Sequence, residues 1–123
     1  MPSRKPSPEK GSGRLDRIAS LIQAEIAQIL RRKVNDKRIG MISITSVEIS
    51  KDLAHAWIYY SELGGKEKFE ETKKGLQSAT KFIKGEVGKV LETQRVPNLH
   101  FVYDDRLEKT AALIEKINAL SND

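Results

Sequence analysis

The chain has 123 residues and a formal net charge of +5, with 38% hydrophobic and 32% charged residues, proportions typical of one globular domain. It contains no cysteine, which excludes disulfides and thiolate-bound metals. No apolar stretch approaches the roughly 20 residues that span a bilayer, and no apolar secretory signal follows Met1. We therefore expect a cytoplasmic protein, and the basic balance favours a polyanionic partner such as nucleic acid.

The first 13 residues differ in composition from the rest of the chain. They hold three of the four prolines, three cations and no apolar residue after Met1. Such a segment cannot bury enough surface to offset its chain entropy. We expect a disordered basic tail over residues 1–13 and a single domain over residues 14–123.

From Leu15 onward, apolar residues recur every three or four positions, which is the spacing of one helix face. The pattern predicts a first helix over residues 14–33. Projection at about 100° per residue places most of its basic residues away from the apolar stripe, so the outer face should be exposed and basic. The arginines on or beside this face are Arg14, Arg17, Arg31 and Arg32.

Two β-type segments follow the first helix. Residues 41–50 alternate between apolar and polar side chains, but the alternation shifts by one position near Thr45 and Ser46, which predicts a β-bulge. Residues 53–61 alternate again after a tight turn. The two segments are therefore predicted to form an antiparallel hairpin.

Residues 67–91 favour a long helix whose apolar stripe runs unbroken through Leu76 and Val87. Gly85 and Gly88 interrupt this helix, where each costs about 1 kcal/mol relative to alanine. Their spacing matches the Gly-x-x-Gly motif of a nucleotide-clamping loop. The continuous apolar stripe instead favours a position inside a helix for both glycines. Both are predicted to lie opposite the stripe among lysines, where bare backbone would let a phosphate approach. The alternative is a solvated lysine face on a fold that tolerates the glycines.

Pro97 terminates this helix, residues 99–103 alternate as a third strand, and a last helix begins near Asp105. The predicted order is helix, two strands, a long helix with a possible break, a strand and a helix. This order defines an α+β fold with a three-stranded sheet packed by helices. The apolar positions of the last helix are Leu107, Ile114, Ile117 and Leu120.

The element order is that of type II KH domains, small α+β modules that bind RNA. The segments RLDRIASLIQAEIAQIL, DKRIGMISITSVEISKDLAHAWIYYS and LQSATKFIKGEVGKVLETQRVPNLHFVYDD together resemble the ribosome-binding factor A family over about residues 14–118. The resemblance implies a KH type II-like fold in which a kink between two helices, typically Ala-x-Gly, replaces the Gly-x-x-Gly loop. The matching residues are Ala79, Thr80 and Lys81, so that a lysine stands where the family has glycine.

The resemblance also implies a function. Members of the family bind the small (30S) ribosomal subunit and assist its late maturation, including 5′-end processing of precursor 16S ribosomal RNA, particularly in the cold. We therefore expect a non-enzymatic monomer that uses no cofactor, metal, membrane or small-molecule substrate. Arg38 matches the family's Asp-Pro-Arg loop, which is Asp-Lys-Arg here. The residues expected to contact RNA are Lys81, Lys84, Lys89 and Arg95, supported by Arg14, Arg17, Arg31, Arg32 and Arg38.

Other chemistry has weaker support in the sequence. His55 and His100 lie on different predicted strands without a third ligand at metal-binding spacing, so a structural role is favoured. Asp104 and Asp105 suit the start of a helix better than a metal site. The chain shows no nucleophile with an adjacent base, no phosphate-binding loop and no dinucleotide fingerprint.

Two other functions are compatible with the same residues. A generic KH-like regulator would bind single-stranded messenger RNA with sequence preference and would ignore ribosomal subunits. A protein interaction module would use the strand face shared by Trp57 and Tyr59, which could otherwise stack on bases, although helices covering that face are favoured. Binding that survives high salt would favour the protein interaction module over either RNA-binding function.

Overall fold

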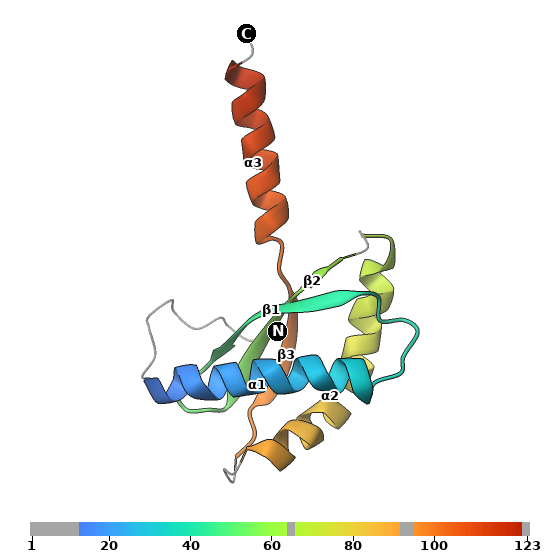
Figure 1. Cartoon of the computed structure of the whole chain (residues 1–123), viewed down its shortest axis with the longest axis vertical. Coiled ribbons are helices and arrows are strands. Elements are labelled where there is room, and N and C mark those ends of the chain that lie inside the picture. The colour runs from blue at the N-terminus through green and yellow to red at the C-terminus, as the bar shows by residue number, and fades with distance from the viewer. Residues whose placement is uncertain (1–12, 64–65, 92–94, 122–123) are drawn as a thin grey trace.

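The fold is described from a computed structural model, which places residues 13–63, 66–91 and 95–121 (Figure 1). Its order confirms the predicted α+β arrangement. The predicted tail lies outside the described residues except for Gly13, which begins the first helix. The elements are α1 (Gly13–Arg32), β1 (Ile42–Ile49), β2 (His55–Glu62), the short 3-10 helix η1 (Lys66–Lys68), α2 (Phe69–Val90), β3 (Asn98–Tyr103) and α3 (Arg106–Ser121).

The three strands form one mixed sheet with β2 in the centre. β1 pairs antiparallel with β2, and its register shifts between Ile44 and Ser46, which confirms the predicted hairpin and bulge. β3 pairs parallel with β2, so α2 serves as the crossover between these two strands. β1 and β3 are therefore the two edges of the sheet.

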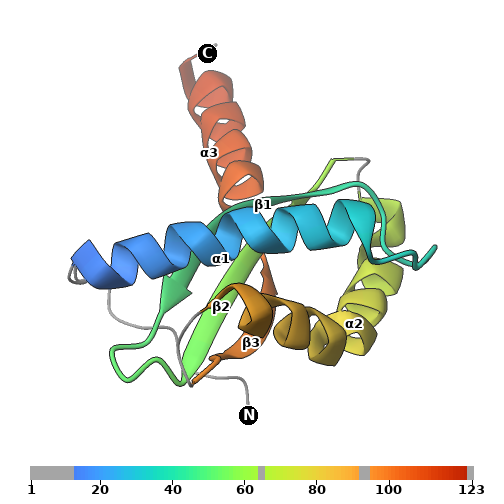
Figure 2. The ribbon, with the colours of Figure 1, turned by 60° about the horizontal axis from the view of Figure 1, so that its bottom comes forward.

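α1 and α2 pack against the same face of the sheet (Figure 2). The spacing of three and four residues aligns the isoleucines of α1 into one stripe that turns toward the strands. The core forms where this stripe meets the apolar residues of α2 and of the sheet. Its buried members are Ile22, Ile26, Ile29, Ala56, Ile58, Ile83, Val87, Leu91 and Leu99.

Trp57 and Tyr59 point away from α1 and α2, because side chains alternate between the two faces of β2. The expectation that helices cover this face is therefore wrong for these two helices. Both side chains are nonetheless only 4% exposed. The Tyr59 hydroxyl donates to a Glu48 carboxylate oxygen at 3.3 Å, and the Arg106 guanidinium lies 5.9 Å from the centre of the Tyr59 ring. Rings this deeply covered offer no open platform on which bases could stack.

α2 is one uninterrupted helix, so the possible break into two helices does not occur. The helix nevertheless changes direction, since its yellow-green first half and its gold second half run along different lines (Figures 1 and 2). The Thr80 hydroxyl donates to the Leu76 carbonyl at 2.7 Å, a contact to residue i−4 that bends helices, and we attribute the bend to it. Because the helix does not restart, its second half has no free N-terminal N–H groups to offer a phosphate.

α3 extends away from the sheet (Figure 1). Asp104 precedes it and accepts hydrogen bonds from the Arg106 backbone N–H at 3.1 Å and from the Arg106 guanidinium at 2.6 Å. The predicted apolar face of α3 has little covering, since Ile114, Ile117 and Leu120 are 52%, 54% and 76% exposed. The Leu107 side chain lies outside the described residues. In the part of the chain that the structure describes, no helix has the length and apolarity to cross a membrane.

Candidate nucleic-acid interface

α1 presents its arginines away from the sheet. Arg14, Arg17, Arg31 and Arg32 are all exposed, as the helical projection predicts. A rise of 1.5 Å per residue separates the first and last of them by about 27 Å. Arg31 and Arg32 occupy the last turn, where positive charge interacts favourably with the negative end of the helix dipole. The arginines therefore form two groups, one at each end of α1.

The C-terminal end of α1 meets the second half of α2 at a shared carboxylate. Glu86 accepts the Lys33 ammonium at 2.7 Å and the Lys89 ammonium at 2.6 Å. These hydrogen bonds lower the pKa of Glu86, and the bond from Lys33 makes the larger contribution. The side chains of Lys33 and Lys89 remain 53% and 74% exposed, so their charges stay accessible to a partner.

Lys33 was not among the residues predicted from the sequence. The available signal was its position directly after two arginines at the end of a basic helix. Its contact with Glu86 brings one cation from the end of α1 beside Lys89 of α2. We call this contact the basic junction, and its cations are Lys33 and Lys89; Arg31, Arg32 and Lys81 are exposed elsewhere on the same two helices.

Lys81 and Lys84 lie on adjacent turns of α2 but differ in their contacts. Lys81 is exposed, and among the described residues no ion pair holds it. Lys84 is half-buried and donates to the side-chain oxygen of Asn98 at 2.7 Å. Asn98 is a neutral amide, so this contact orients Lys84 beside the start of β3 without neutralising its charge.

The two glycines of α2 have different surroundings. A Cβ added at Gly85 would meet no described atom within 4 Å beyond the helix's own backbone, so the predicted bare surface exists there. A Cβ at Gly88 would lie 3.0 Å from Cγ2 of Val96. The prediction that core packing does not account for the glycines is therefore wrong for Gly88, which lets the segment before β3 approach α2 closely.

Arg38 is exposed in the loop between α1 and β1 and is held by Asp36. The Arg38 guanidinium donates to both carboxylate oxygens at 2.7 to 3.2 Å, and its backbone N–H donates to the same group at 2.9 Å. These contacts lower the pKa of Asp36 to about 2. A side-chain turn thus orders the loop where the family has proline, and the carboxylate offsets the charge that Arg38 offers to a phosphate.

Arg95 is exposed shortly before β3. The pKa of Asp52 is lowered chiefly by the Ser50 hydroxyl and the Ala54 backbone N–H, with a smaller contribution from the charge of Arg95. This electrostatic contact locates Arg95 near the turn between β1 and β2. Arg95 and Lys84 thus form a second basic group at the start of β3.

The two histidines, expected to be separate structural residues, are neighbours. Nδ1 of His55 lies 2.9 Å from Nε2 of His100, and the ring of Trp57 stacks on His100 with 5.7 Å between ring centres. Burial and the charge of His55 lower the pKa of His100. Within the described residues no three groups of metal-binding type converge, and this pair lies on the sheet face away from α1 and α2.

The structure places the predicted cations in several exposed groups on the helices and at the start of β3. Lys33 and Lys89 form the basic junction, and Arg31, Arg32 and Lys81 are exposed elsewhere on α1 and α2. Lys84 and Arg95 lie at the start of β3, and Arg14 and Arg17 stand apart at the far end of α1. A mixed three-stranded sheet covered on one face by α1 and a bent α2, with cations along both helices, defines a KH type II-like domain.

Comparison with known proteins identifies the family within this class. The sequence model of the family described as ribosome-binding factor A matches residues 14–117. Ribosome-binding factor A of Dechloromonas aromatica is 40% identical over 117 residues, which cover 93% of this chain and 94% of that protein. The chain belongs to the ribosome-binding factor A family.

Solved structures agree on the fold. The crystal structure of ribosome-binding factor A from Thermus thermophilus superposes with a TM-score of 0.64 at 18% identity, covering 72% of this chain and 94% of that one. A homology model of the Thermus thermophilus factor, fitted into a cryo-electron microscopy map of a complex with the 30S subunit, superposes with a TM-score of 0.55 at 17% identity, covering 77% of this chain and 96% of that one.

Proposed function

We propose that this protein binds the small ribosomal subunit through its ribosomal RNA and assists late maturation of that subunit, including 5′-end processing of precursor 16S ribosomal RNA. It acts by binding rather than by catalysis, as a monomer in the cytoplasm, and its contribution is largest in the cold. The observation that carries the proposal is membership of the ribosome-binding factor A family over residues 14–117. The Thermus thermophilus factor, which shares the fold, was fitted into a complex with the 30S subunit.

The basic junction supplies the physical basis for RNA binding. Lys33 and Lys89 flank Glu86 there, and Arg31, Arg32 and Lys81 are exposed elsewhere on the same two helices, so this part of the protein attracts phosphates. Lys81 and Gly85 are one turn apart on the exposed face of α2, where a phosphate can approach the helix backbone beside an ammonium group. Each cation that contacts a phosphate releases counterions, so binding should weaken steeply as salt rises.

Binding at this surface would hold a local arrangement of precursor RNA until maturation is complete. Lys84 and Arg95 extend the contact toward β3, and Arg14 and Arg17 extend it along α1. Phosphate contacts of this kind position a protein without reading sequence. Selectivity for the small subunit would therefore come from the shape of the folded RNA that matches the two helices.

Gradient co-sedimentation with purified small subunits, large subunits and assembled ribosomes tests the proposal. We expect the protein to travel with free small subunits only and to be released at high salt. Lys81→Glu should weaken this binding about tenfold, because it reverses one charge at an exposed position. Lys116→Glu is the matched control, since it makes the same charge change on an exposed turn of α3, outside the proposed surface.

Two results would contradict the proposal. One is sedimentation of the folded protein with none of the three particles, and the other is equal binding of small subunits by Lys81→Glu and Lys116→Glu. Tight, sequence-selective binding to short single-stranded RNA without subunit binding would instead support the messenger RNA regulator. In cells, depletion should cause precursor 16S RNA with an extended 5′ end to accumulate, most strongly at low temperature.

A further inference from the structure

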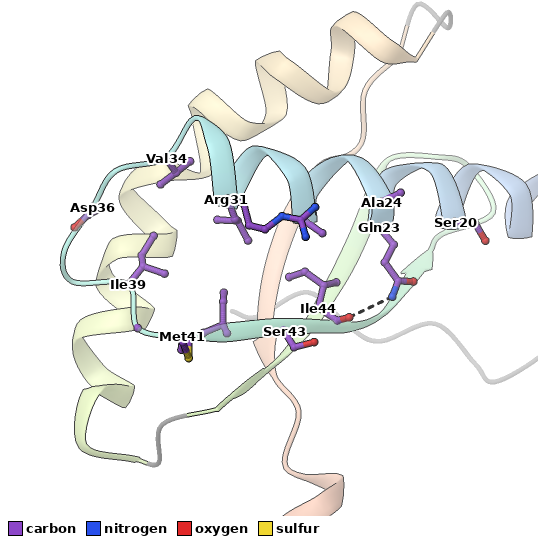
Figure 3. Close-up of a pocket in the computed structure, with 14 residues that line it drawn as sticks. Ser20, Gln23, Ala24, Arg31, Val34, Asp36, Ile39, Met41, Ser43 and Ile44 are labelled. Carbon is purple, nitrogen blue, oxygen red and sulfur yellow. Dashed lines mark hydrogen bonds between the residues drawn. The ribbon is translucent and has the colours of Figure 1, made fainter.

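A groove of about 650 Å³ lies between α1 and the edge strand β1 (Figure 3). It is separate from the exposed face of α2 that the proposed RNA contact uses. On α1 it runs from Ser20 to Arg31, and on the opposite side it runs from Ile39 to Ile44. Its walls are mainly aliphatic, and the alanines Ala24 and Ala27 leave space above the helix backbone.

The backbone of β1 turns hydrogen-bonding groups toward this groove. The Met41 carbonyl accepts from the Leu63 N–H at 2.7 Å, so the polar groups of Met41 face β2. These groups alternate in direction along an edge strand, so those of Ile42 and Ile44 face outward. Gln23 confirms this direction, because its side-chain amide reaches from α1 and donates to the Ile44 carbonyl at 3.2 Å (Figure 3).

The dimensions of the groove suit an extended chain. Only Ile42 to Ile44 of this wall belong to β1, so at about 3.3 Å per residue the stretch from Ile39 to Ile44 measures at most about 17 Å. At 1.5 Å per residue, the stretch of α1 from Ser20 to Arg31 also measures about 17 Å. Five or six residues in β conformation match this length, so a short strand fits between the two walls.

The charges of the lining favour an acidic occupant. Asp36 lies in the lining, but the hydrogen bonds from Arg38 already engage both of its carboxylate oxygens. Arg31 also lines the groove, and the structure shows no ion pair for it among the described residues. The unpaired charge of the groove is therefore positive. One cation among aliphatic walls offers RNA neither a track of phosphate contacts nor aromatic rings.

We propose that this groove binds an extended peptide from a partner protein as a fourth strand beside β1. The peptide is five or six residues long, with aliphatic side chains at alternate positions and an acidic side chain opposite Arg31. Main-chain hydrogen bonds to the Ile42 N–H and carbonyl and to the Ile44 N–H supply affinity, because the Ile44 carbonyl already accepts from Gln23. The alternating side chains supply specificity. This inference does not rest on the proposed ribosomal function, with which it shares only Arg31.

Selection from a phage library of random 12-residue peptides on the immobilised full chain tests the proposal. Ala24→Trp is the reference variant, because Ala24 is exposed and lines the groove, so an indole there fills the groove without entering the core. We expect peptides with alternating aliphatic residues and a nearby Asp or Glu to be enriched at least about tenfold over the variant. Equal recovery on both proteins, or enriched peptides without that pattern, would overturn the proposal.

A synthetic peptide of the selected sequence then tests the binding mode. Its addition should slow hydrogen exchange of the Ile42 and Ile44 amides, and N-methylation of its backbone at alternate residues should abolish binding. Arg31→Glu should weaken binding about tenfold, and replacing the acidic residue of the peptide by lysine should restore it. Equal binding by the N-methylated peptide, or protection of the same amides by single-stranded RNA alone, would refute strand addition.

The same variants separate this inference from the proposed function. Ala24→Trp should still sediment with small subunits, because Ala24 lies outside the cations of the basic junction. Loss of peptide binding with retained subunit binding is the expected result. Loss of both in a correctly folded variant would show that the groove is not an independent site.

Discussion

Gly85→Ala should stabilise the protein while weakening its binding to RNA. A methyl group at Gly85 meets no described atom within 4 Å beyond the helix's own backbone, so it introduces no clash. Alanine is favoured over glycine inside a helix by about 1 kcal/mol. A gain of that size should raise the melting temperature of a domain of this length by about 4 °C. The methyl group would also stand between the helix backbone and a phosphate, and this should weaken binding to small subunits.

Urea unfolding followed by circular dichroism measures the stability change, and Gly75→Ala is the control within the same helix. A Cβ at Gly75 would lie 2.6 Å from Cγ1 of Ile39, so either this side chain or α2 must move. Overpacking of this kind costs about 1 to 3 kcal/mol, which exceeds or cancels the gain in helix propensity. A loss of stability for Gly85→Ala, or an equal gain for Gly75→Ala, would refute the reasoning.

Three further predictions concern charge. Glu86→Gln should strengthen binding to small subunits and steepen its salt dependence, because it removes the one carboxylate of the basic junction; unchanged affinity across a salt series would contradict this. The hydrogen bonds from Arg106 lower the pKa of Asp104, so the stability they add is present above about pH 4 and is lost as the pH falls further. In Asp104→Asn, the free energy of unfolding in urea should therefore depend less on pH below about pH 4. Burial lowers the pKa of His100, so the unfolded chain takes up a proton first and stability should fall as pH drops below about 6.5. His100→Gln should reduce this fall in urea-unfolding stability, and an identical profile would exclude the assignment.

The fold was largely predictable because its elements follow local periodicity. The stripe of isoleucines in α1 and the one-residue slip near Thr45 each produced the element that the pattern predicts. The bend of α2 was harder to predict from the sequence, because it accompanies a hydrogen bond from Thr80 and does not interrupt the apolar stripe. The exposure of α3 was not predictable either, since an apolar spacing indicates a helix but not whether anything covers it.

The candidate site was predictable as a list of cations but not as a surface. Sequence shows which residues are charged, and helical projection shows which of them face outward. It does not show that Glu86 joins two helices, that Lys84 is tied to Asn98, or that Asp36 offsets Arg38. The contact of Gly88 with Val96 could not be predicted from the sequence either, because it arises only from tertiary packing.

The affinity for purified small subunits, measured as a function of potassium chloride concentration, tests the central claim most directly. If Arg31, Arg32, Lys33, Lys81 and Lys89 all contact phosphates, the logarithm of the association constant should fall with the logarithm of salt at a slope of about −3.5. Lys81→Glu should make this slope shallower by about 0.7, whereas Lys116→Glu should leave it unchanged. Tight binding that is independent of salt, with both variants equal to the natural chain, would contradict recognition of ribosomal RNA through this surface.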